Sequence, residues 1–585
     1  MNTLFAYLSP GTNLDLIPIG LAYVASALKE TGRYVSGFNA CKFNNPIGEL
    51  IKTLSEENID LLCIGDLSAN FPTIKHTINM VKRHLPQIKI MLGGGIITAE
   101  PELIARHLNI DYGCIGYGEE TIYEFAECFE NRGNFAEVKG LIFKDEFGNI
   151  IITPHRPEPE SIDEISFPDL EMFGFAGMEQ SLTIIGSRSC MYNCTFCFHP
   201  SGHSYKQRSL DNIFSEIDYW RNKHEIRHIT YSDELFGSDE KRLYEFCRRI
   251  KRIDIGFNLS LRVDIITDEI IEALADSGCR GISYGIESLC QNVLDSMRKN
   301  ITVQQIESAL KITKKYNLPI IGSGIIFGDC VETYEMALES LSWWLKNIHF
   351  GLSIGFITAY PGSVLYKNGV KNGRISDRIK FLEQRCPITN LSAMSDMEFL
   401  RLRRVVELMR GMEGEPVTGL KIEDTGEEGI FFYADCPSCD TRNYVHYNNV
   451  IKDAMIDINF KICNKCGSKI RIAQQYKNNL LENQYFENFD YLDKKIAVWG
   501  VSQTTSFRLA TVKKMREAVV VVVDRDYHNH KNEFWGFTVQ SPDILPMFDF
   551  NVLYIGSRNA RKKILSTAKT ILGTDLDNKE LMMID

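Results

Sequence analysis

The chain has 585 residues, of which 44% are hydrophobic and 24% are charged, and its formal net charge is -11. This length is too great for one hydrophobic core and predicts three or four domains. The acidic balance argues against nucleic acid as the main partner, because phosphate binding favours a basic face. The longest apolar run, AVVVVV at 518–523, is far shorter than the roughly 20 residues that cross a bilayer, so we expect no membrane association.

The first residues, MNTLFAYLSPGT, lack the basic start and the long apolar core of a secretory signal peptide, so we expect a cytoplasmic protein. The chain contains 16 cysteines. In a reducing compartment, metal ligation or plain burial explains thiols better than disulfides do. Nine of these cysteines occur singly, and we expect them to be small buried apolar residues.

Residues 1–150 alternate between apolar segments and amphipathic ones. The expected strands include TLFAYLSP, IDLLCIGDLS and QIKIMLGGG, with helices such as IGLAYVASALKETG between them. Near-continuous apolar strands between helices predict an α/β domain with a parallel, doubly wound sheet, which binds ligands outside the carboxyl ends of its strands. A polar hairpin with its turn at Gly148 follows, and residues 151–180 form a linker rich in proline and acidic residues.

Residues 181–375 repeat the alternation about six times, which predicts a partial (β/α)6 barrel. The expected strands are SLTIIGSRS, IRHITYSDELF, GFNLSLRVD, CRGISYGIES, LPIIGSGIIFG and GLSIGFITAYPGS. Polar residues gather where these strands end, which is the side that carries the active site in parallel barrels. Residues 376–425 are expected to be a helical extension, residues 426–475 a small cysteine-rich module, and residues 490–585 a third α/β domain.

Three cysteines, Cys190, Cys194 and Cys197, lie within eight residues at C-x3-C-x2-C spacing. This motif and the barrel around it resemble the radical SAM enzymes from about residue 180 to 365. Three thiolates from one loop can hold three irons of a [4Fe-4S] cluster, and the open fourth iron can then chelate S-adenosylmethionine. The alternatives are three buried cysteines in a turn, or a zinc site that His199 completes.

The resemblance implies roles for residues around the three cysteines. Phe196 occupies the family's aromatic position, whose loop faces adenine. Glu287, followed by Ser288, resembles the position that bonds the ribose or the methionyl group of S-adenosylmethionine. Arg262 resembles the basic residue that meets the methionyl carboxylate, a task that suits a guanidinium.

Two acidic residues and one turn complete this comparison with the family. Asp233 and Glu234 resemble the acidic position near the methionyl amine; the alternative is surface charge at the start of the next helix. The segment AYPGS (359–363) resembles the family's PGT-type turn, which could contact substrate or serve only as a turn.

Residues 1–150 resemble the cobalamin-binding domains that precede radical SAM barrels. The matching segments are PIGLAYVASALKETG, MLGGGIITAEPE and IGYGEETI. Their glycines would let the backbone approach a corrin closely, and the positions concerned are Gly93, Gly94, Gly95, Gly116 and Gly118. Residues 1–135 contain no Asp-x-His-x-x-Gly motif, whose histidine ligates cobalt from below. The resemblance therefore implies cobalt without a histidine ligand on its lower face.

A second cysteine set, Cys436, Cys439, Cys463 and Cys466, forms two C-x2-C pairs. Paired knuckles of this kind hold zinc through four thiolates, so we expect a zinc-ribbon-like module with structural Zn. The alternative is rubredoxin-like iron or a second iron–sulfur cluster, which would act as an electron relay.

The last domain resembles a Rossmann-like nucleotide-binding unit, as in small domains attached to sugar-modifying and C-methylating enzymes. The matching segments are KKIAVWGVSQTTSFR and AVVVVVDRD. The fingerprint is degraded, because Val501 and Ser502 follow Gly500 where G-x-G is expected. Asp524 could contact ribose. A docking or substrate-carrier role is the alternative.

Together these resemblances imply a cobalamin-dependent radical SAM enzyme. The first hypothesis is a C-methyltransferase that acts on an unactivated carbon of a small molecule through a 5′-deoxyadenosyl radical. The second is a cyclase or rearrangement enzyme with the same cofactors, and the third is a non-catalytic sensor or scaffold. The expected partners are a small-molecule substrate, with a nucleotide-linked one as an option, and an electron donor such as flavodoxin or ferredoxin.

Overall fold

The protein is described by a computed structural model in which two compact units are distinguished, Met1–Ile472 and Ala473–Asp585. The described residues are 1–8, 18–43, 45–175, 181–202, 204–237, 239–410, 415–416, 418–424, 430–435, 441–447, 460–462, 469–471, 489, 491–501, 505, 509, 513–529, 534, 537–556 and 561–582. No helix within these ranges is long and apolar enough to cross a membrane.

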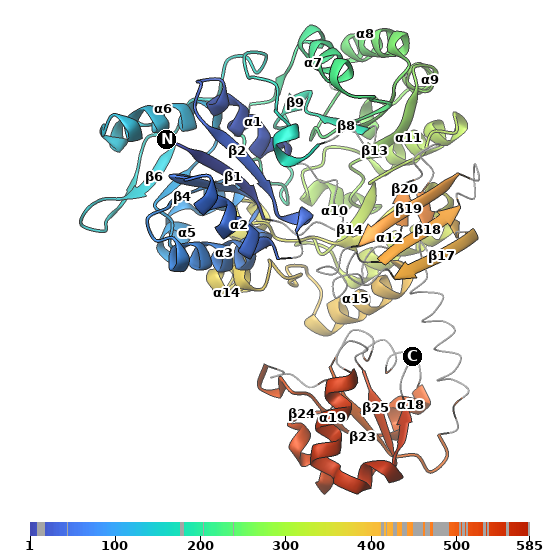
Figure 1. Cartoon of the computed structure of the whole chain (residues 1–585). Coiled ribbons are helices and arrows are strands. Elements are labelled where there is room, and N and C mark those ends of the chain that lie inside the picture. The colour runs from blue at the N-terminus through green and yellow to red at the C-terminus, as the bar shows by residue number, and fades with distance from the viewer. Residues whose placement is uncertain are drawn as a thin grey trace. The chain divides into compact units, whose positions relative to one another are not determined.

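The N-terminal domain is built on a seven-stranded sheet in the order β2-β1-β3-β4-β5-β6-β7 (Figure 1). The first five strands are parallel, and β6 and β7 add an antiparallel hairpin at one edge. The strand bounds are Thr3–Tyr7 (β1), Val35–Asn39 (β2), Leu61–Gly65 (β3), Lys89–Gly93 (β4), Tyr112–Cys114 (β5), Leu141–Lys144 (β6) and Ile150–Ile152 (β7). The doubly wound sheet and the hairpin predicted from the sequence are both confirmed.

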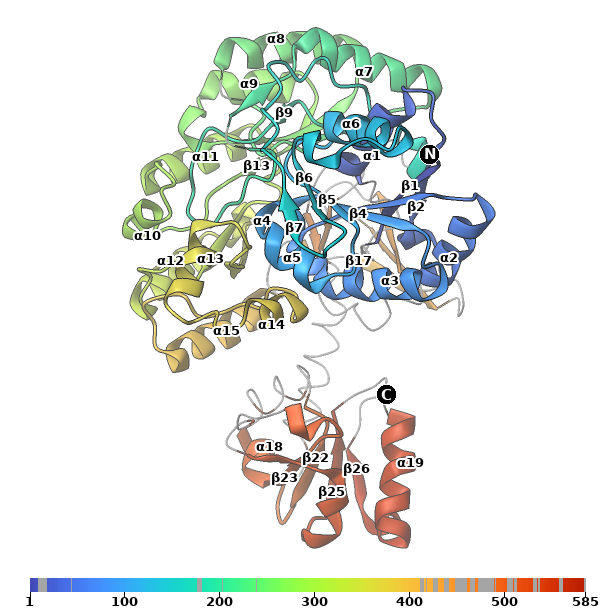
Figure 2. The same cartoon turned by 90° about the vertical axis from the view of Figure 1, so that its left-hand side faces the viewer.

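Helices cover both faces of this sheet (Figure 2). Helices α1 and α6 pack on one face through Ala22, Leu28 and Phe125, and the helices α2 to α5 pack on the other face through residues such as Leu50 and Ile74. The helix bounds are Ile19–Lys29 (α1), Pro46–Glu56 (α2), Phe71–His84 (α3), Gly95–Ala99 (α4), Pro101–His107 (α5) and Glu119–Glu130 (α6). Because side chains alternate along a strand, each strand feeds both layers.

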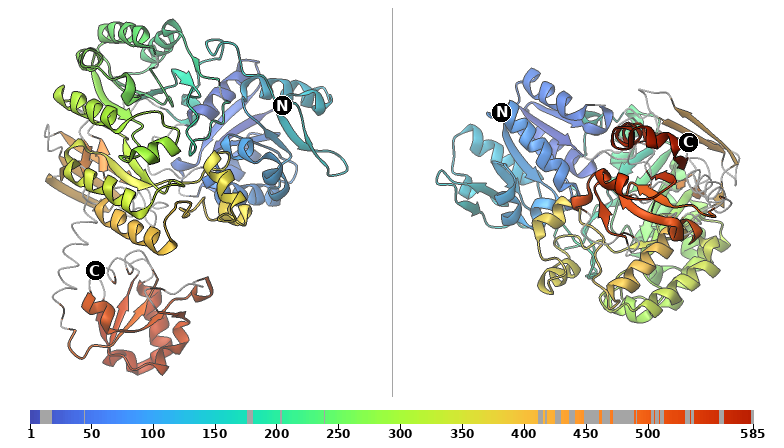
Figure 3. Two further views of the ribbon diagram at one scale, coloured as in Figure 1. Left: turned by 180° about the vertical axis from the view of Figure 1, so that it is seen from behind. Right: turned by 90° about the horizontal axis from the view of Figure 1, so that it is seen from below.

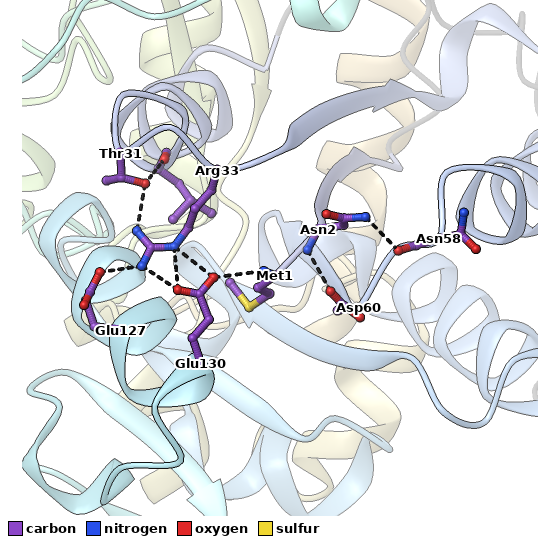
Figure 4. A network of polar contacts seen from close by, with 9 residues as sticks. Met1, Asn2, Thr31, Arg33, Asn58, Asp60, Glu127 and Glu130 are labelled. Carbon is purple, nitrogen blue, oxygen red and sulfur yellow. Dashed lines mark hydrogen bonds and ion pairs between the residues drawn. The ribbon is translucent and has the colours of Figure 1, made fainter.

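A polar network joins the start of β1 to the loop after α1 and the end of α6 (Figure 4). The Arg33 guanidinium donates to Glu127 and to both carboxylate oxygens of Glu130, and the Met1 amine lies 2.9 Å from Glu130 Oε1. Asn2 N donates to Asp60 Oδ2 at 2.8 Å. The contacts with Arg33 and with the Met1 amine lower the pKa of Glu130 to about 2, and Arg33 contributes most.

The barrel contains six parallel strands in chain order. Strands β8, β11, β12 and β13 form one sheet, and β14 and β15 continue it through isolated bridges from Ile282 to Ile320 and from Glu287 to Ile325. The strand bounds are Ser181–Ile184 (β8), His228–Tyr231 (β11), Gly256–Leu261 (β12), Cys279–Tyr284 (β13), Gly324–Phe327 (β14) and Ser353–Phe356 (β15). The strands are shorter than predicted, mostly because the last residues of a predicted segment leave the sheet and form site loops. In β14 it is instead residues 318–323, at the start of the predicted segment, that lie outside the strand.

Helices cover the outside of the barrel, and those in the described residues alternate with its strands. Their bounds are Leu210–Lys223 (α7), Glu240–Ile250 (α8), Asp268–Asp276 (α9), Gln291–Ser296 (α10), Val303–Lys315 (α11) and Tyr334–Lys346 (α12). Thr267 caps α9, since its side chain accepts a hydrogen bond from Ile270 N at 3.3 Å. The predicted partial (β/α)6 architecture is therefore present.

The segment after the barrel contains α13 (Val364–Lys371), α14 (Arg378–Glu383) and α15 (Asp396–Arg410). Helix α14 packs against the N-terminal domain, as the views from behind and below also show (Figure 3). Glu383 pairs with Lys75 at 2.6 Å, and Arg378 pairs with Glu100 at 3.0 Å. The segment that follows the barrel therefore connects the barrel to the N-terminal domain through α14.

The predicted helical extension at 376–425 needs a correction, because its last part is extended. Helix α15 ends at Arg410, and strand β17 (Thr418–Asp424) pairs with β18 (Ile430–Asp435), which pairs with β19 (Arg442–Tyr447). A second small sheet contains β16 (Glu415–Pro416), β20 (Phe460–Ile462) and β21 (Lys469–Arg471). The cysteines predicted to bind zinc, Cys436, Cys439, Cys463 and Cys466, lie outside the described residues.

The C-terminal unit has a five-stranded parallel sheet in the order β24-β23-β22-β25-β26. One face buries Val498, Val522 and Tyr554, and the opposite face buries Trp499 and Leu553. The element bounds are Ile496–Trp499 (β22), Lys513–Ala518 (α18), Val519–Val523 (β23), Val539–Gln540 (β24), Val552–Ile555 (β25), Arg561–Leu572 (α19) and Glu580–Met582 (β26). The third α/β domain is present.

Candidate active site

The three-cysteine loop follows the first barrel strand and is held at its base and its middle. At the base, Asp233 Oδ1 accepts hydrogen bonds from Gly186 N at 2.7 Å and Ser187 N at 3.0 Å. In the middle, Thr195 N donates to Met297 O at 3.0 Å, and Thr195 O accepts from Leu365 N at 2.8 Å. Because Thr195 lies directly after Cys194 and two residues before Cys197, these bonds fix the thiol-bearing backbone.

The three thiols of this loop are half-buried and close enough to influence one another. Burial raises the pKa of Cys194, and the neighbouring thiols of Cys197 and Cys190 raise it further, whereas the ammonium of Lys299 opposes this rise. In the part of the chain that the structure describes, no group of three His, Cys, Asp or Glu side chains converges to hold one metal ion. A [4Fe-4S] cluster does not need such convergence, because each thiolate binds a different iron. The loop therefore supplies three half-buried thiols, one for each of three irons.

Both phenylalanines of the three-cysteine loop are packed, but in different places. Phe196, predicted to face adenine, lies against a small core that includes Val293 and Leu365. Phe198 lies beside Gly95 of the N-terminal domain, and a Cβ at Gly362 of the barrel would overlap its ring. No motif in the sequence points to Phe198. Its close packing against Gly95 and Gly362 is visible in the structure.

The acidic pair predicted near the methionyl amine supports the loop. Asp233 is 6% exposed, and burial raises its pKa to about 7. Its Oδ2 has no hydrogen-bond partner within the described residues. Glu234 Oε2 lies 2.7 Å from Nδ1 of His199, the residue considered for a zinc site. Asp233 thus positions the start of the loop, and Glu234 contacts its end.

Four polar residues meet beyond the end of the fourth strand. Glu287 has a φ of +64°, and its Oε1 accepts a hydrogen bond from Lys299 Nζ at 2.9 Å. Ser288 is buried, and its hydroxyl accepts from Cys290 N at 3.1 Å. Arg262 is also buried, with Nε and Nη2 donating to Asp264 and Nη2 donating to Lys299 O at 3.0 Å. The family resemblance implies a role for Arg262, whereas no motif marks Lys299.

The predicted glycines lie at the carboxyl edge of the N-terminal sheet. Gly94 has a φ of +80°, and a Cβ there would lie 2.7 Å from Asp66 O, so only glycine fits. Gly116 has a φ of +77° and open space before it. Gly93 is half-buried, Gly95 is buried, and the buried Gly118 packs against Val24. Bare backbone at Gly94 and Gly116 can approach a flat macrocycle such as a corrin.

An apolar side chain lies beside this edge, whereas two histidines of the N-terminal domain lie at the opposite edge. Leu67, which follows the third strand, is 52% exposed and lies next to Gly95. His84 and His107 are the last residues of α3 and α5, so they lie at the opposite edge of the sheet. Their Nδ1 atoms contact carbonyls of their own helices, Met80 O and Leu103 O.

The three-cysteine loop lies directly against this glycine-rich edge. A Cβ at Gly95 would lie 3.7 Å from Phe198 Cε1 and 3.9 Å from Pro200 Cβ. Nearby, Arg188 Nη2 donates to Glu119 Oε1 at 2.6 Å, and its guanidinium lies 5.0 Å from the ring centre of Tyr23. The two predicted cofactor sites, one on each domain, are therefore neighbours.

Two family models match the two domains that meet here. The model of the radical SAM superfamily matches residues 184–343, and the model of the B12 binding domain matches residues 12–126. The matched ranges contain the three-cysteine loop and the glycine-rich edge, respectively. This agrees with the resemblance found in the sequence.

Curated proteins with and without an assigned activity are similar to this chain. An uncharacterized methyltransferase of Pyrococcus horikoshii is 27% identical over 368 residues, which cover 61% of this chain and 79% of that protein. The anaerobic magnesium-protoporphyrin IX monomethyl ester cyclase of Rubrivivax gelatinosus is 25% identical over 348 residues, which cover 55% of this chain and 62% of the cyclase.

A solved structure shares the fold. The radical S-adenosylmethionine methyltransferase TsrM from Kitasatospora setae, with tryptophan and a SAM analogue bound, superposes with a TM-score of 0.54 and 17% sequence identity. The match covers 64% of this chain and 76% of TsrM.

Proposed function

We propose that this chain, whose two domains match the models of the radical SAM superfamily and of the B12 binding domain, methylates an unactivated carbon of a small molecule. The observation that carries the proposal is the contact between the three-cysteine loop and Gly95 at the glycine-rich edge. When bound, the cluster and cobalamin supply the electron that cleaves S-adenosylmethionine to a 5′-deoxyadenosyl radical and the carrier for the methyl group. The protein's part is to hold both side by side.

The residues divide into those that hold each cofactor and those that hold the loop. Cys190, Cys194 and Cys197 would ligate iron. The carboxyl-edge glycines 93–95, 116 and 118 would lie against the corrin. Glu287, Ser288 and Arg262 would line the place for S-adenosylmethionine, with Phe196 behind the loop. Asp233 and Glu234 position the two ends of the loop.

The direct test is anaerobic reconstitution followed by incubation with S-adenosylmethionine and a low-potential reductant. We expect iron and cobalt in the protein and release of 5′-deoxyadenosine. Cys197→Ala should abolish this release, whereas Cys128→Ala, in α6 and away from the loop, should leave it unchanged. Equal release by both variants, or zinc in place of reducible iron, would contradict the proposal.

Cyclisation or rearrangement without methyl transfer is the second candidate, and the similarity to a cyclase favours it. The mass of the product separates the two reactions once a substrate is found. With S-adenosylmethionine labelled on its methyl group, methyl transfer places the label in the product. A cyclase would release 5′-deoxyadenosine and leave the product unlabelled.

A structural zinc held by Cys436, Cys439, Cys463 and Cys466 is part of the proposal. Strand β18 ends at Asp435 and its antiparallel partner β19 begins at Arg442, so the first C-x2-C pair belongs to the connection between them. The second pair likewise falls between β20, which ends at Ile462, and β21, which begins at Lys469. Two C-x2-C pairs can hold zinc through four thiolates, and metal analysis should give one zinc per chain.

The C-terminal unit, Rossmann-like in its strand order, is proposed to bind a nucleotide-linked substrate or to dock a partner. Gly500, after the central strand, has a φ of +110° and approaches Gly556. Val501 N donates to Asp524 Oδ2 at 2.8 Å, which ties the predicted ribose-binding residue to the turn.

We further propose a cytoplasmic enzyme reduced by a flavodoxin or a ferredoxin. Its cluster and the 12 free cysteines of the described residues suit a reducing compartment.

A further inference from the structure

Lys299 is a buried lysine beside the three-cysteine loop. The residue is 8% exposed, and its Nζ lies 2.9 Å from Glu287 Oε1. An ammonium has three hydrogen-bond donors, and the described residues satisfy one of them. A charge is expensive to bury unless it serves a partner, so the position of Lys299 requires an explanation.

The backbone around Lys299 is shaped to bring its ammonium into the site. A Cβ at Gly285 would overlap Nζ, so the end of the fourth strand is left bare for it. Arg298 and Asn300, on either side of the lysine, have φ values of +54° and +53°, and Glu287 has +64°. Non-glycine residues in this region are strained, and such strain gathers at functional sites.

Arg262 is hydrogen-bonded to the backbone of this segment. Its Nη2 donates to Lys299 O at 3.0 Å and to Asn300 O at 3.2 Å. Its Cζ lies 3.6 Å from the ring centre of Tyr192, which belongs to the three-cysteine loop. The guanidinium of Arg262 therefore bridges the backbone of Lys299 and Asn300 to the three-cysteine loop.

The same segment is attached to the loop next to a thiol. Met297 O accepts the hydrogen bond from Thr195 N, directly after Cys194. Although burial lowers the pKa of Lys299, Glu287 and Cys194 together raise it above its ordinary value, so the ammonium stays charged. The Lys299 ammonium, paired with Glu287, thus belongs to a segment that is hydrogen-bonded to the three-cysteine loop directly after Cys194.

We propose that Lys299 supplies the positive charge that favours the reduced state of the cluster held by Cys190, Cys194 and Cys197. This proposal rests on the proposed function, since it needs the cluster. Reduction adds one electron, taken from an external donor, and so adds one negative charge to the cluster. A cation in a poorly solvated place nearby stabilises that added charge, and hydrogen bonds and net charge set the potentials of iron–sulfur clusters. Arg262 is then a positioning residue.

The test is a redox titration of the reconstituted holoprotein without S-adenosylmethionine, followed by electron paramagnetic resonance of the reduced cluster. We compare the wild type with Lys299→Met, Lys299→Arg and Gly285→Ala at equal iron content. Lys315→Met, which removes an exposed lysine at the end of α11, is the matched control.

Lys299→Met should lower the ratio of reduced to oxidised cluster at a given potential at least tenfold, which is about 59 mV for one electron. Lys299→Arg keeps the charge and should restore most of the shift. Gly285→Ala, which displaces Nζ while keeping the charge, should shift the midpoint in the same direction as Lys299→Met. Lys315→Met should not shift it.

Two results would overturn the proposal. The first is an unchanged midpoint in both Lys299→Met and Gly285→Ala. The second is an unchanged midpoint with weaker binding of S-adenosylmethionine, which would make Lys299 a ligand of that molecule. A wild-type protein without a reducible cluster would overturn the proposed function as well, so the two failures are distinguishable.

Discussion

Glu332 is a buried carboxyl whose ionisation the fold opposes. It is 1% exposed, its Oε2 accepts a hydrogen bond from Gly328 N at 2.6 Å, and its Oε1 has no partner within the described residues. Burial, and then the carboxylate of Asp329, raise its pKa to about 8. The group therefore keeps its proton in the folded protein at pH values where the unfolded chain has lost it.

Glu332→Gln should remove a pH dependence of stability. Between about pH 4.5 and 8 the folded wild type binds more protons than the unfolded chain, so its unfolding free energy falls as the pH rises. Glutamine keeps an acceptor for Gly328 N and does not titrate. The variant should gain a few kcal/mol relative to wild type across this range, at about 1.4 kcal/mol per pKa unit. Denaturant unfolding of both apo-proteins at pH 5 and pH 8 measures this, and an equal difference at the two pH values would refute it.

What the sequence could predict at this scale depended on spacing. Cys190, Cys194 and Cys197 lie within eight residues of the chain, so their spacing alone is enough to recognise the motif. Lys299 has no such signal, because its burial depends on the bare Gly285 and on left-handed backbone at its two neighbours. Arg262 was found by the resemblance, but its hydrogen bonds to backbone carbonyls appear only in three dimensions.

In the three-cysteine loop, the ring of Phe198 lies next to two glycines, Gly95 and Gly362. A Cβ at Gly362 would overlap the ring of Phe198, which follows Cys197, and Gly362 has a φ of +95°. Gly373 offers a matched position, since it has a φ of +73° and open space. An alanine at either position would be strained by the left-handed backbone, but only an alanine at Gly362 would also overlap the ring of Phe198.

Gly362→Ala should therefore damage the loop, whereas Gly373→Ala should only strain the backbone. The strain alone costs on the order of 1–3 kcal/mol. In Gly362→Ala the displaced Phe198 should also move Cys197, so reconstituted protein should hold less iron. Iron analysis and the cluster's absorbance check this. Equal iron in the two variants would show that the fit of Phe198 does not matter.

The elements themselves followed from hydrophobic patterning, with errors at their ends. The six barrel strands and the doubly wound sheet were predicted, because buried parallel strands read as apolar runs. The segment LPIIGSGIIFG was predicted as one strand, but only Gly324–Phe327 is, since the chain joins its neighbour near Ile320 by a single bridge. Residues 418–424 were placed in a helical extension, but they pair with β18, a partner that local sequence does not reveal.

At the scale of the whole molecule, a buried ion pair joins the barrel to the N-terminal domain. Arg188 and Glu119 side chains are each 12% exposed. The Arg188 guanidinium also lies over the rings of Tyr23 and Tyr117. The pair sits beside the contact of the loop with the glycine-rich edge, so it should fix the relation of the two cofactor sites.

Arg188→Met should destabilise this junction by about 3–5 kcal/mol, because it leaves Glu119 buried without its partner. The double variant Arg188→Met/Glu119→Gln should recover much of the loss. Arg106→Met, which breaks an exposed pair with Glu102 on α5, should cost less than about 1 kcal/mol. Denaturant unfolding of the apo-proteins measures all three. A loss in Arg188→Met no larger than in Arg106→Met would show that the pair does not hold the domains.

In the proposed enzyme the cluster and cobalamin lie side by side between the two domains. The direct measurement is electron paramagnetic resonance of the partly reduced holoprotein, in which the reduced cluster and cob(II)alamin each carry an unpaired electron. We expect each signal to be broadened or split by the other, and we expect Cys197→Ala to leave the cobalt signal sharp. Two unperturbed signals in a protein that holds both cofactors would contradict this arrangement.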